Sequence, residues 1–166
     1  MDKTTYADIG SISSATLRSE DILPVFLECL RELATRANNT EHLGVCADVD
    51  AELDALETLS TVIDDLHDTY YASDSVSMLI NETLMDALSC YALPYFYFGA
   101  HPGDGADFGF WLSEELEETF DGLKVADLSE VPNTYWGEVL HVNDHGNVSL
   151  YSCELGGKLT EVWAVV

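Results

Sequence analysis

The chain has 166 residues, a length typical of one domain. It contains 31 Asp and Glu against 6 Lys and Arg, which gives a formal net charge of −25, yet 47% of its residues are hydrophobic. This apolar content excludes a disordered acidic tail, and the charge argues against nucleic acid or an anionic membrane as a direct partner. No export signal opens the chain and no apolar run is long enough to span a membrane. We therefore expect a cytoplasmic protein with free cysteines.

Helical spacing dominates the first half of the chain. The first 18 residues are weakly patterned and predict an arm or a short edge element. Apolar residues recurring every three or four positions predict helices over 19–37, 47–70 and 76–91. Ser19 is the expected N-cap of the first helix, Asp74 or Ser75 caps the third, and Pro94 ends the helical pattern. The expected inner face of the second helix consists of Val49, Leu53, Leu56, Ile63 and Leu66, with Leu59 close by.

Strand signals dominate the second half. Aromatic density predicts strands over 95–98 and 108–112 around a glycine-rich turn, and three more strands are expected over 135–142, 148–153 and 160–166. Two turns with hairpin chemistry join the last three strands. The sequence thus predicts an α+β fold in which N-terminal helices pack on a C-terminal antiparallel sheet. We expect a single domain over 1–166, with a helical half at about 19–92 and a sheet half at about 95–166.

The charge is unevenly distributed. No Lys or Arg occurs between Arg36 and Lys124, although 19 of the 31 acids lie in that stretch. Like charge destabilises a compact chain by self-repulsion, so such a surface calls for an explanation. Solubility and a salt-rich cytoplasm are two explanations, and a surface built to meet a basic protein is a third.

A row of carboxylates on the second predicted helix fits the third explanation. Steps of four, three, seven and four residues keep these side chains on one face, over roughly 27 Å. Neighbouring acids would lie about 4.5–6 Å apart along the axis, near the spacing of nucleic-acid phosphates, although any acidic helix face gives similar numbers. The predicted partner-binding residues are Asp50, Asp54, Glu57, Asp64 and Asp68, with a second set on a short helix capped by Ser113, namely Glu114, Glu115, Glu117 and Glu118.

Two groups of residues have side chains that can bind metal. Imidazole and carboxylate are ligands of zinc and other divalent ions, and they occur together in the glycine turn and near the later hairpin. The candidate ligands are His101, Asp104, Asp107, His141 and His145, with Asp144 beside them. The alternative is that these residues make turn hydrogen bonds. A second possible zinc site combines Cys29, His42, Cys46 and Cys90, whose thiols are equally typical of small buried residues.

No motif predicts catalysis. The chain lacks the Gly-x-Ser-x-Gly elbow of serine hydrolases, and its Gly-Asp-Gly turn lacks the Lys of a phosphate-binding loop. We therefore do not expect an enzyme. A metal-dependent hydrolase that uses the His/Asp residues is the alternative.

The aromatic and glycine-rich segment carries a resemblance. Residues 95–111, YFYFGAHPGDGADFGFW, and residues 142–151, VNDHGNVSLY, resemble motifs of small acidic proteins encoded by bacteriophages and mobile elements. The resemblance covers the C-terminal part of the chain and implies no activity by itself. It does imply a setting, because phages use compact acidic proteins against host nucleases, among them anti-restriction and anti-CRISPR proteins.

Charge and resemblance together predict an anti-defence inhibitor. The favoured partner is a Cas nuclease such as Cas9, whose channels are lined with Lys and Arg for guide and target strands. An anti-restriction DNA mimic is a close alternative. A structural or regulatory protein that is acidic only for solubility is the third possibility.

Overall fold

A computed structural model describes residues 5–63 and 65–165 of the chain. The fold is α+β, and the chain divides into two compact units, 2–113 and 114–166, which we describe separately. Within the described residues, no helix combines the length and the apolar character that a membrane crossing requires.

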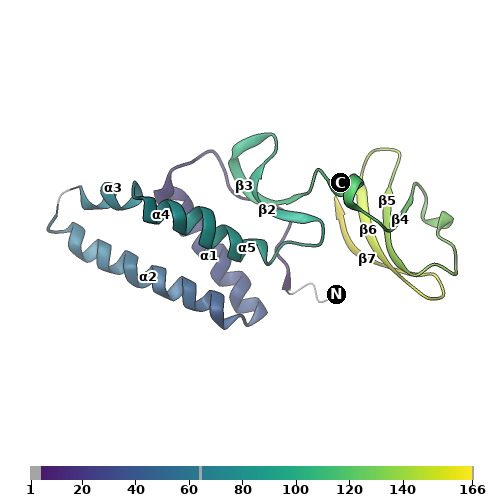
Figure 1. Ribbon diagram of the computed structural model, residues 1–166, viewed down its shortest axis with the longest axis horizontal. Helices are drawn as coiled ribbons and strands as arrows, with labels where there is room; N and C mark the ends of the chain where they lie inside the picture. Colours follow the sequence, from purple (N-terminus) through teal and green to yellow (C-terminus); the bar gives the residue numbers. More distant parts are fainter. Residues whose placement is uncertain (1–4, 64, 166) are drawn as a thin grey trace. The chain divides into compact units, whose positions relative to one another are not determined.

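Helices α1 (Ser19–Ala37) and α2 (Thr40–Ser60) form an antiparallel pair in the first unit (Figure 1). Helix α1 buries an apolar face that includes Ile22, Phe26, Leu30 and Leu33, as the spacing predicts. The helix begins one residue after Arg18, so Ser19 lies inside the helix and is not its N-cap. Asn38 ends the helix in the left-handed region at φ 54°, a conformation that Asn tolerates better than most residues.

Short helices complete the helical layer. Helix α3 (Leu66–Tyr71) follows α2, and α4 (Asp74–Met78), a π-helical segment (Leu79–Leu84) and α5 (Met85–Ser89) run on without a break. Ser73, rather than Asp74 or Ser75, caps this last run, because its side chain accepts a hydrogen bond from the Val76 amide.

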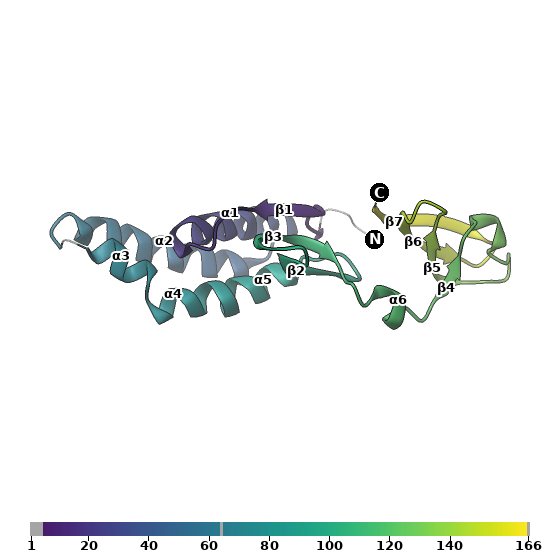
Figure 2. The ribbon, with the colours of Figure 1, turned by 90° about the horizontal axis from the view of Figure 1, so that it is seen from above.

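A three-stranded sheet packs against these helices (Figure 2). Its order is β1 (Gly10–Ser13), β3 (Asp104–Leu112), β2 (Phe96–His101), and both pairings are antiparallel. The rings of Phe98 and Phe108 lie 5.1 and 5.5 Å from that of Phe26 on α1, both edge-on. A side chain at Gly109 would collide with the Gly10 carbonyl, so glycine is required where β1 meets β3.

The second unit is built on a mixed sheet. A short helix, α6 (Leu116–Thr119), precedes β4 (Leu123–Val125), and a 3-10 turn (Leu128–Glu130) leads to β5 (Gly137–Val142), β6 (Val148–Glu154) and β7 (Lys158–Val165). The order is β4-β5-β6-β7, with β4 parallel to β5 and the other pairs antiparallel. Val139 and Leu140 are adjacent on β5 and both fully buried, so both faces of this strand are covered.

The expected boundary between the two halves is wrong. Strands β2 and β3 belong with the helices, because their aromatic side chains complete the core around Phe26. The sheet that packs on the N-terminal helices is therefore the three-stranded one. The two predicted hairpins over 135–166 are confirmed by the β5-β6 and β6-β7 registers, whereas β4 and its parallel pairing were not predicted.

Candidate functional site

Helix α2 carries three of the nine predicted partner-binding acids, Asp50, Asp54 and Glu57. It packs on α1 through Cys46, Val49 and Leu56, which recur at steps of three and seven and are all buried. Leu43, Val45 and Leu53 are half-buried against the same core, and α2 also contacts α3. Exposed carboxylates on it are Asp54 and Glu57 of the predicted row, together with Glu41, Asp48 and Glu52. The acids thus surround the outer side of α2 rather than forming one narrow line.

Asp50 differs from its neighbours. Its carboxylate is half-exposed and accepts two hydrogen bonds from Arg31 of α1, each 2.8 Å long. Arg31 also pairs with Glu28 on its own helix. Among the described residues, Asp50 is the only α2 carboxylate in an ion pair. The prediction that Asp50 faces a partner is therefore not supported by its surroundings, since it serves the contact between α1 and α2.

The predicted second helix is wrong in its length. It ends at Ser60, and α3 begins only at Leu66, so the acidic row is not one continuous 27 Å face. Hydroxyl groups explain the ending, because Thr58, Ser60 and Thr61 donate to carbonyls three or four residues back and compete with the helical hydrogen bonds. Asp68 lies exposed on α3, and Asp64 lies outside the described residues.

The four glutamates of the second predicted set belong to the other unit. Glu114, Glu115, Glu117 and Glu118 are all exposed around α6, which begins at Leu116 with Glu115 at the N-cap position in place of the predicted Ser113. Lys124 reaches back to the main-chain carbonyl of Glu117. Carboxylates near a helix N-terminus are favourably placed against the helix dipole, which gives these residues a local role as well.

The predicted metal ligands of the glycine turn have hydrogen-bond partners within the turn or across the sheet. The ring of His101 packs edge-on against Trp111, and its Nδ1 accepts from the Gly103 amide. Asp104 accepts from the Ala106 amide at 3.0 Å, and Asp107 accepts from the Ser11 hydroxyl across the sheet. The contacts of His101 and Asp104 follow the turn alternative that the sequence left open, whereas the contact of Asp107 joins β3 to β1.

The remaining predicted ligands lie in the 114–166 unit. His141 on β5 contacts the Ala126 carbonyl through Nε2 at 3.2 Å, while Asn143 rather than Asp144 accepts the amide hydrogen bonds that close the β5-β6 turn. Asp144 and His145 are exposed in that turn. Among the described residues, no three His, Cys, Asp or Glu side chains are grouped as a metal ion requires. Zinc binding through His101, Asp104, Asp107, His141 and His145 remains a prediction.

The cysteine and histidine residues of the second candidate zinc site have separate partners. Cys46 is buried with its thiol toward the Leu27 carbonyl, exposed Cys90 contacts the Asp86 carbonyl, and His42 Nδ1 lies 2.9 Å from the Tyr91 hydroxyl. Cys29 lines a pocket of about 290 Å³ between β1 and α1, together with Glu32 and Arg36. Burial, and then the charge of Glu32, raise the pKa of the Cys29 thiol to about 11, against an opposing effect of Arg36.

Apolar exposure is the feature that sequence reasoning missed. Leu59, Val62 and Ile63, at the end of α2 and in the turn that follows, expose 52%, 82% and 49% of their surface. Periodicity places Ile63 on the inner face of a longer helix, with Leu59 close to that face. The cluster of Thr and Ser hydroxyls at 58–61 was the available signal that the helix ends earlier.

No protein-family model matches the chain, and no curated protein or solved structure shows significant similarity to it. The resemblance of residues 95–111 and 142–151 to acidic phage proteins therefore remains a prediction.

Proposed function

We propose that this protein is a non-catalytic inhibitor of a nucleic-acid enzyme, which it binds through the exposed carboxylates of α2 and α3. The observation that carries the proposal is the set of α2 acids around Asp54 and Glu57. They lie on the open side of a well-packed helix, and Arg31 neutralises only Asp50 among them in the described residues. The chain supplies no Lys or Arg between 37 and 123 that could balance them.

A basic partner relieves this imbalance. Carboxylates held on a rigid helix are already in position when they meet a Lys- and Arg-lined surface, and the attraction speeds association while making it sensitive to salt. Cas nucleases present such surfaces along their guide and target strands. We favour an anti-CRISPR inhibitor that acts on a Cas9-like nuclease in the cytoplasm of the host cell, with the glutamates of α6 as a second contact.

The test is target-DNA cleavage by a panel of Cas and restriction nucleases, with and without the protein, at two salt concentrations. We expect inhibition of a Cas nuclease that weakens as salt rises. Inhibition of a restriction nuclease alone would instead support the anti-restriction alternative. If no nuclease in the panel is inhibited, the proposal is wrong.

Charge-reversed variants test the surface. Because exposed ion pairs contribute only about 0–1 kcal/mol each, single substitutions will have small effects. The combined variant Asp54→Lys, Glu57→Lys and Asp68→Lys should lose most of the inhibition. The matched control reverses three exposed acids on other helices, Glu32, Glu82 and Asp86, and changes the net charge equally. Equal loss in both variants would mean that net charge, and not the α2-α3 surface, drives binding.

A further inference from the structure

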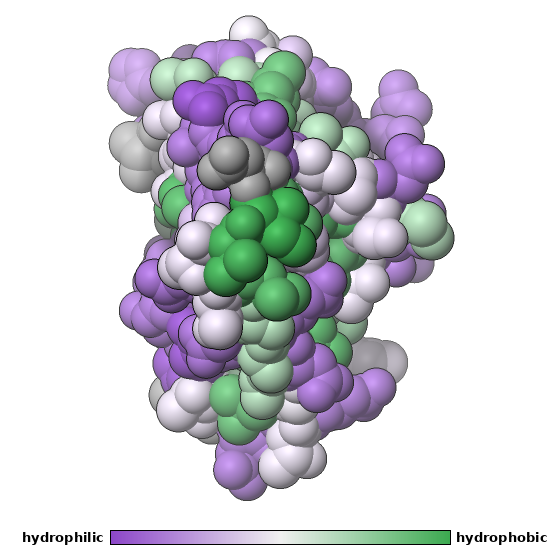
Figure 3. Space-filling view, turned by 90° about the vertical axis from the view of Figure 1, so that its left-hand side faces the viewer, coloured by the Kyte–Doolittle hydropathy of each residue, from purple (hydrophilic) through white to green (hydrophobic). Residues whose placement is uncertain are grey.

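The end of the helical unit where α2 turns into α3 combines apolar and acidic exposure. Figure 3 faces this end and shows a green apolar patch bordered by purple hydrophilic side chains. We define the apolar tip as Leu59, Val62 and Ile63. Surface residues of this size are normally scattered singly, whereas three within five positions form a contiguous patch.

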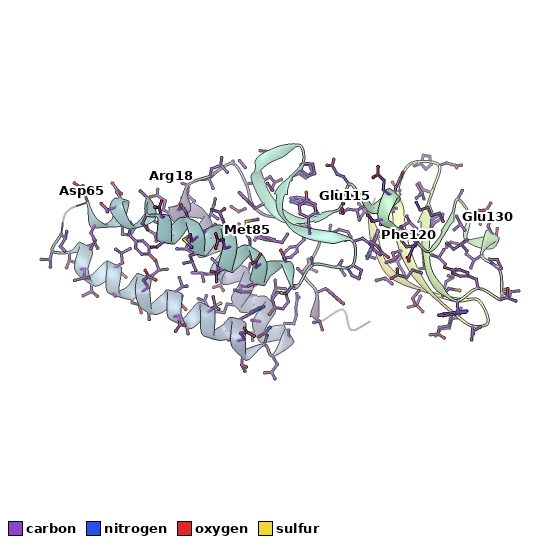
Figure 4. All side chains as sticks on the ribbon, viewed as in Figure 1. Arg18, Asp65, Met85, Glu115, Phe120 and Glu130 are labelled. Atoms are coloured by element: carbon purple, nitrogen blue, oxygen red, sulfur yellow. The ribbon has the colours of Figure 1, made fainter. Side chains whose placement is uncertain are left out.

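Acidic side chains border the apolar tip. Glu57 lies two residues before Leu59 in the chain, and Asp65 and Asp68 follow Ile63, all three exposed. Asp65 lies at the turn between the two helices (Figure 4), with φ 62°, a left-handed conformation that Asp tolerates. The last turn of α2 has no basic residue, so the negative end of its helix dipole adds to the same potential.

We propose that the apolar tip is the anchor by which this protein docks into an apolar pocket rimmed by Lys and Arg on a partner protein. The inference rests on the proposed function and names the part of the surface that would dominate the interaction. Interface energy is concentrated in a few well-packed, fully desolvated side chains, while surrounding charges contribute mainly to association rate and specificity. The acids around the tip thus select a basic rim, and the three apolar residues supply the buried contact.

Charge complementarity selects this occupant over a second copy of the chain. A symmetric dimer through the tip would bring Glu57, Asp65 and Asp68 of one copy near the same residues of the other. Like charges facing one another across an interface are unfavourable, and the described residues of α2 and α3 include no Lys or Arg to compensate.

The probe for this site is a synthetic amphipathic helical peptide made of leucine and lysine. Two control peptides of equal length replace either leucine by glutamine or lysine by glutamate. Isotope-labelled protein is titrated with each peptide, and resonance shifts and affinity are measured. We expect the leucine–lysine peptide alone to bind tightly, with the largest shifts at Leu59, Val62 and Ile63.

Variants establish which residues carry the binding. The combined variant Leu59→Ser, Val62→Ser and Ile63→Ser changes exposed positions and should keep its circular dichroism spectrum, while the affinity falls at least about tenfold. The matched control, Trp136→Ser with Leu155→Ser, removes the exposed apolar pair of the other unit, which is 70% and 78% exposed, and should bind as the unchanged protein does. Shifts spread over all acidic faces, shifts centred on Trp136, or self-association through the tip would each overturn the inference.

The two proposals fail separately. If the peptide docks on the tip and no nuclease is inhibited, the docking site stands and the proposed function is wrong. If a nuclease is inhibited equally by the unchanged protein and by the triple serine variant, the proposed function stands and the tip is not the anchor.

Discussion

The guanidinium of Arg31 on α1 holds the carboxylate of Asp50 on α2 through one nitrogen, Nη2, which lies 2.8 Å from both carboxylate oxygens. Partial burial by itself would lower the pKa of Arg31, but the hydrogen bond and the charge of Asp50 outweigh it and raise that pKa. The pair ties the two long helices together. It also removes one carboxylate from the surface that we propose for a partner.

This relationship predicts different effects at two neighbouring acids. Asp50→Asn should lower the free energy of unfolding by about 0.5–1 kcal/mol, because it weakens a half-exposed ion pair between helices. Asp54→Asn, at an exposed position without an ion pair among the described residues, should leave stability unchanged. Urea unfolding followed by circular dichroism measures both. Equal destabilisation by the two substitutions would contradict the special role of Asp50.

The two compact units should unfold separately. Their buried clusters are built from different segments, one around Phe26 and one around Val139. Leu150 is fully buried opposite Leu140, and Leu150→Ala should cost about 2–5 kcal/mol in the 114–166 unit. We expect an earlier loss of the Trp163 environment with little change in the helical signal. Coincident transitions by fluorescence and circular dichroism would instead support the single domain predicted from the sequence.

Cysteine reactivity should follow burial. With a pKa of about 11, only about one Cys29 thiol in a thousand is ionised at pH 8, and the thiolate is the reactive form. Exposed Cys90 should therefore react with iodoacetamide well before Cys29, as mass spectrometry of the native protein can show. Faster modification of Cys29 than of Cys90 would contradict the burial of the Cys29 thiol.

The same shift has a consequence for stability. Folding raises the pKa of Cys29 above its ordinary value of 9.0. The protonated thiol therefore contributes to the stability of the folded state, and this contribution is complete below about pH 9. This contribution is lost as pH rises from 9 to about 11. The urea midpoint of the native protein should fall over that range more than that of Cys29→Ala. Parallel pH profiles of the two proteins would refute the shift.

Metal binding can be settled by elemental analysis of untagged protein. The sequence predicts stoichiometric zinc, and chelation should then lower the melting temperature, because metal binding contributes to folding. His101→Ala and His141→Ala should each reduce the zinc content if both histidines are ligands. Metal-free protein from zinc-supplemented cells would leave His101, Asp104 and Asp107 with only the hydrogen bonds described above.

The sequence by itself determined the elements whose signals are local. Ile22, Phe26, Leu30 and Leu33 form a stripe at helical spacing that can only be buried on one side, and α1 follows it. The turns at 143–147 and 154–158 carry their own hydrogen-bonding groups, so the hairpins of β5, β6 and β7 could be predicted from the sequence. The absence of Lys and Arg between 37 and 123 likewise needs no structure.

Tertiary structure decided what depends on distant partners. Phe98 and Phe108 join the helical unit because the ring of Phe26, more than 70 positions earlier, lies within 5.5 Å of both. The parallel pairing of β4 with β5 is supported by the Tyr135 hydroxyl, which accepts from the Leu123 amide. Only the packing of α2 on α1 decides which carboxylates remain free, since Arg31 can reach Asp50 but not the rest of the helix. The hydroxyl groups at 58–61 favour an early end of α2, and that ending leaves Leu59, Val62 and Ile63 in solvent, where periodicity alone would have buried Ile63 with Leu59 close by.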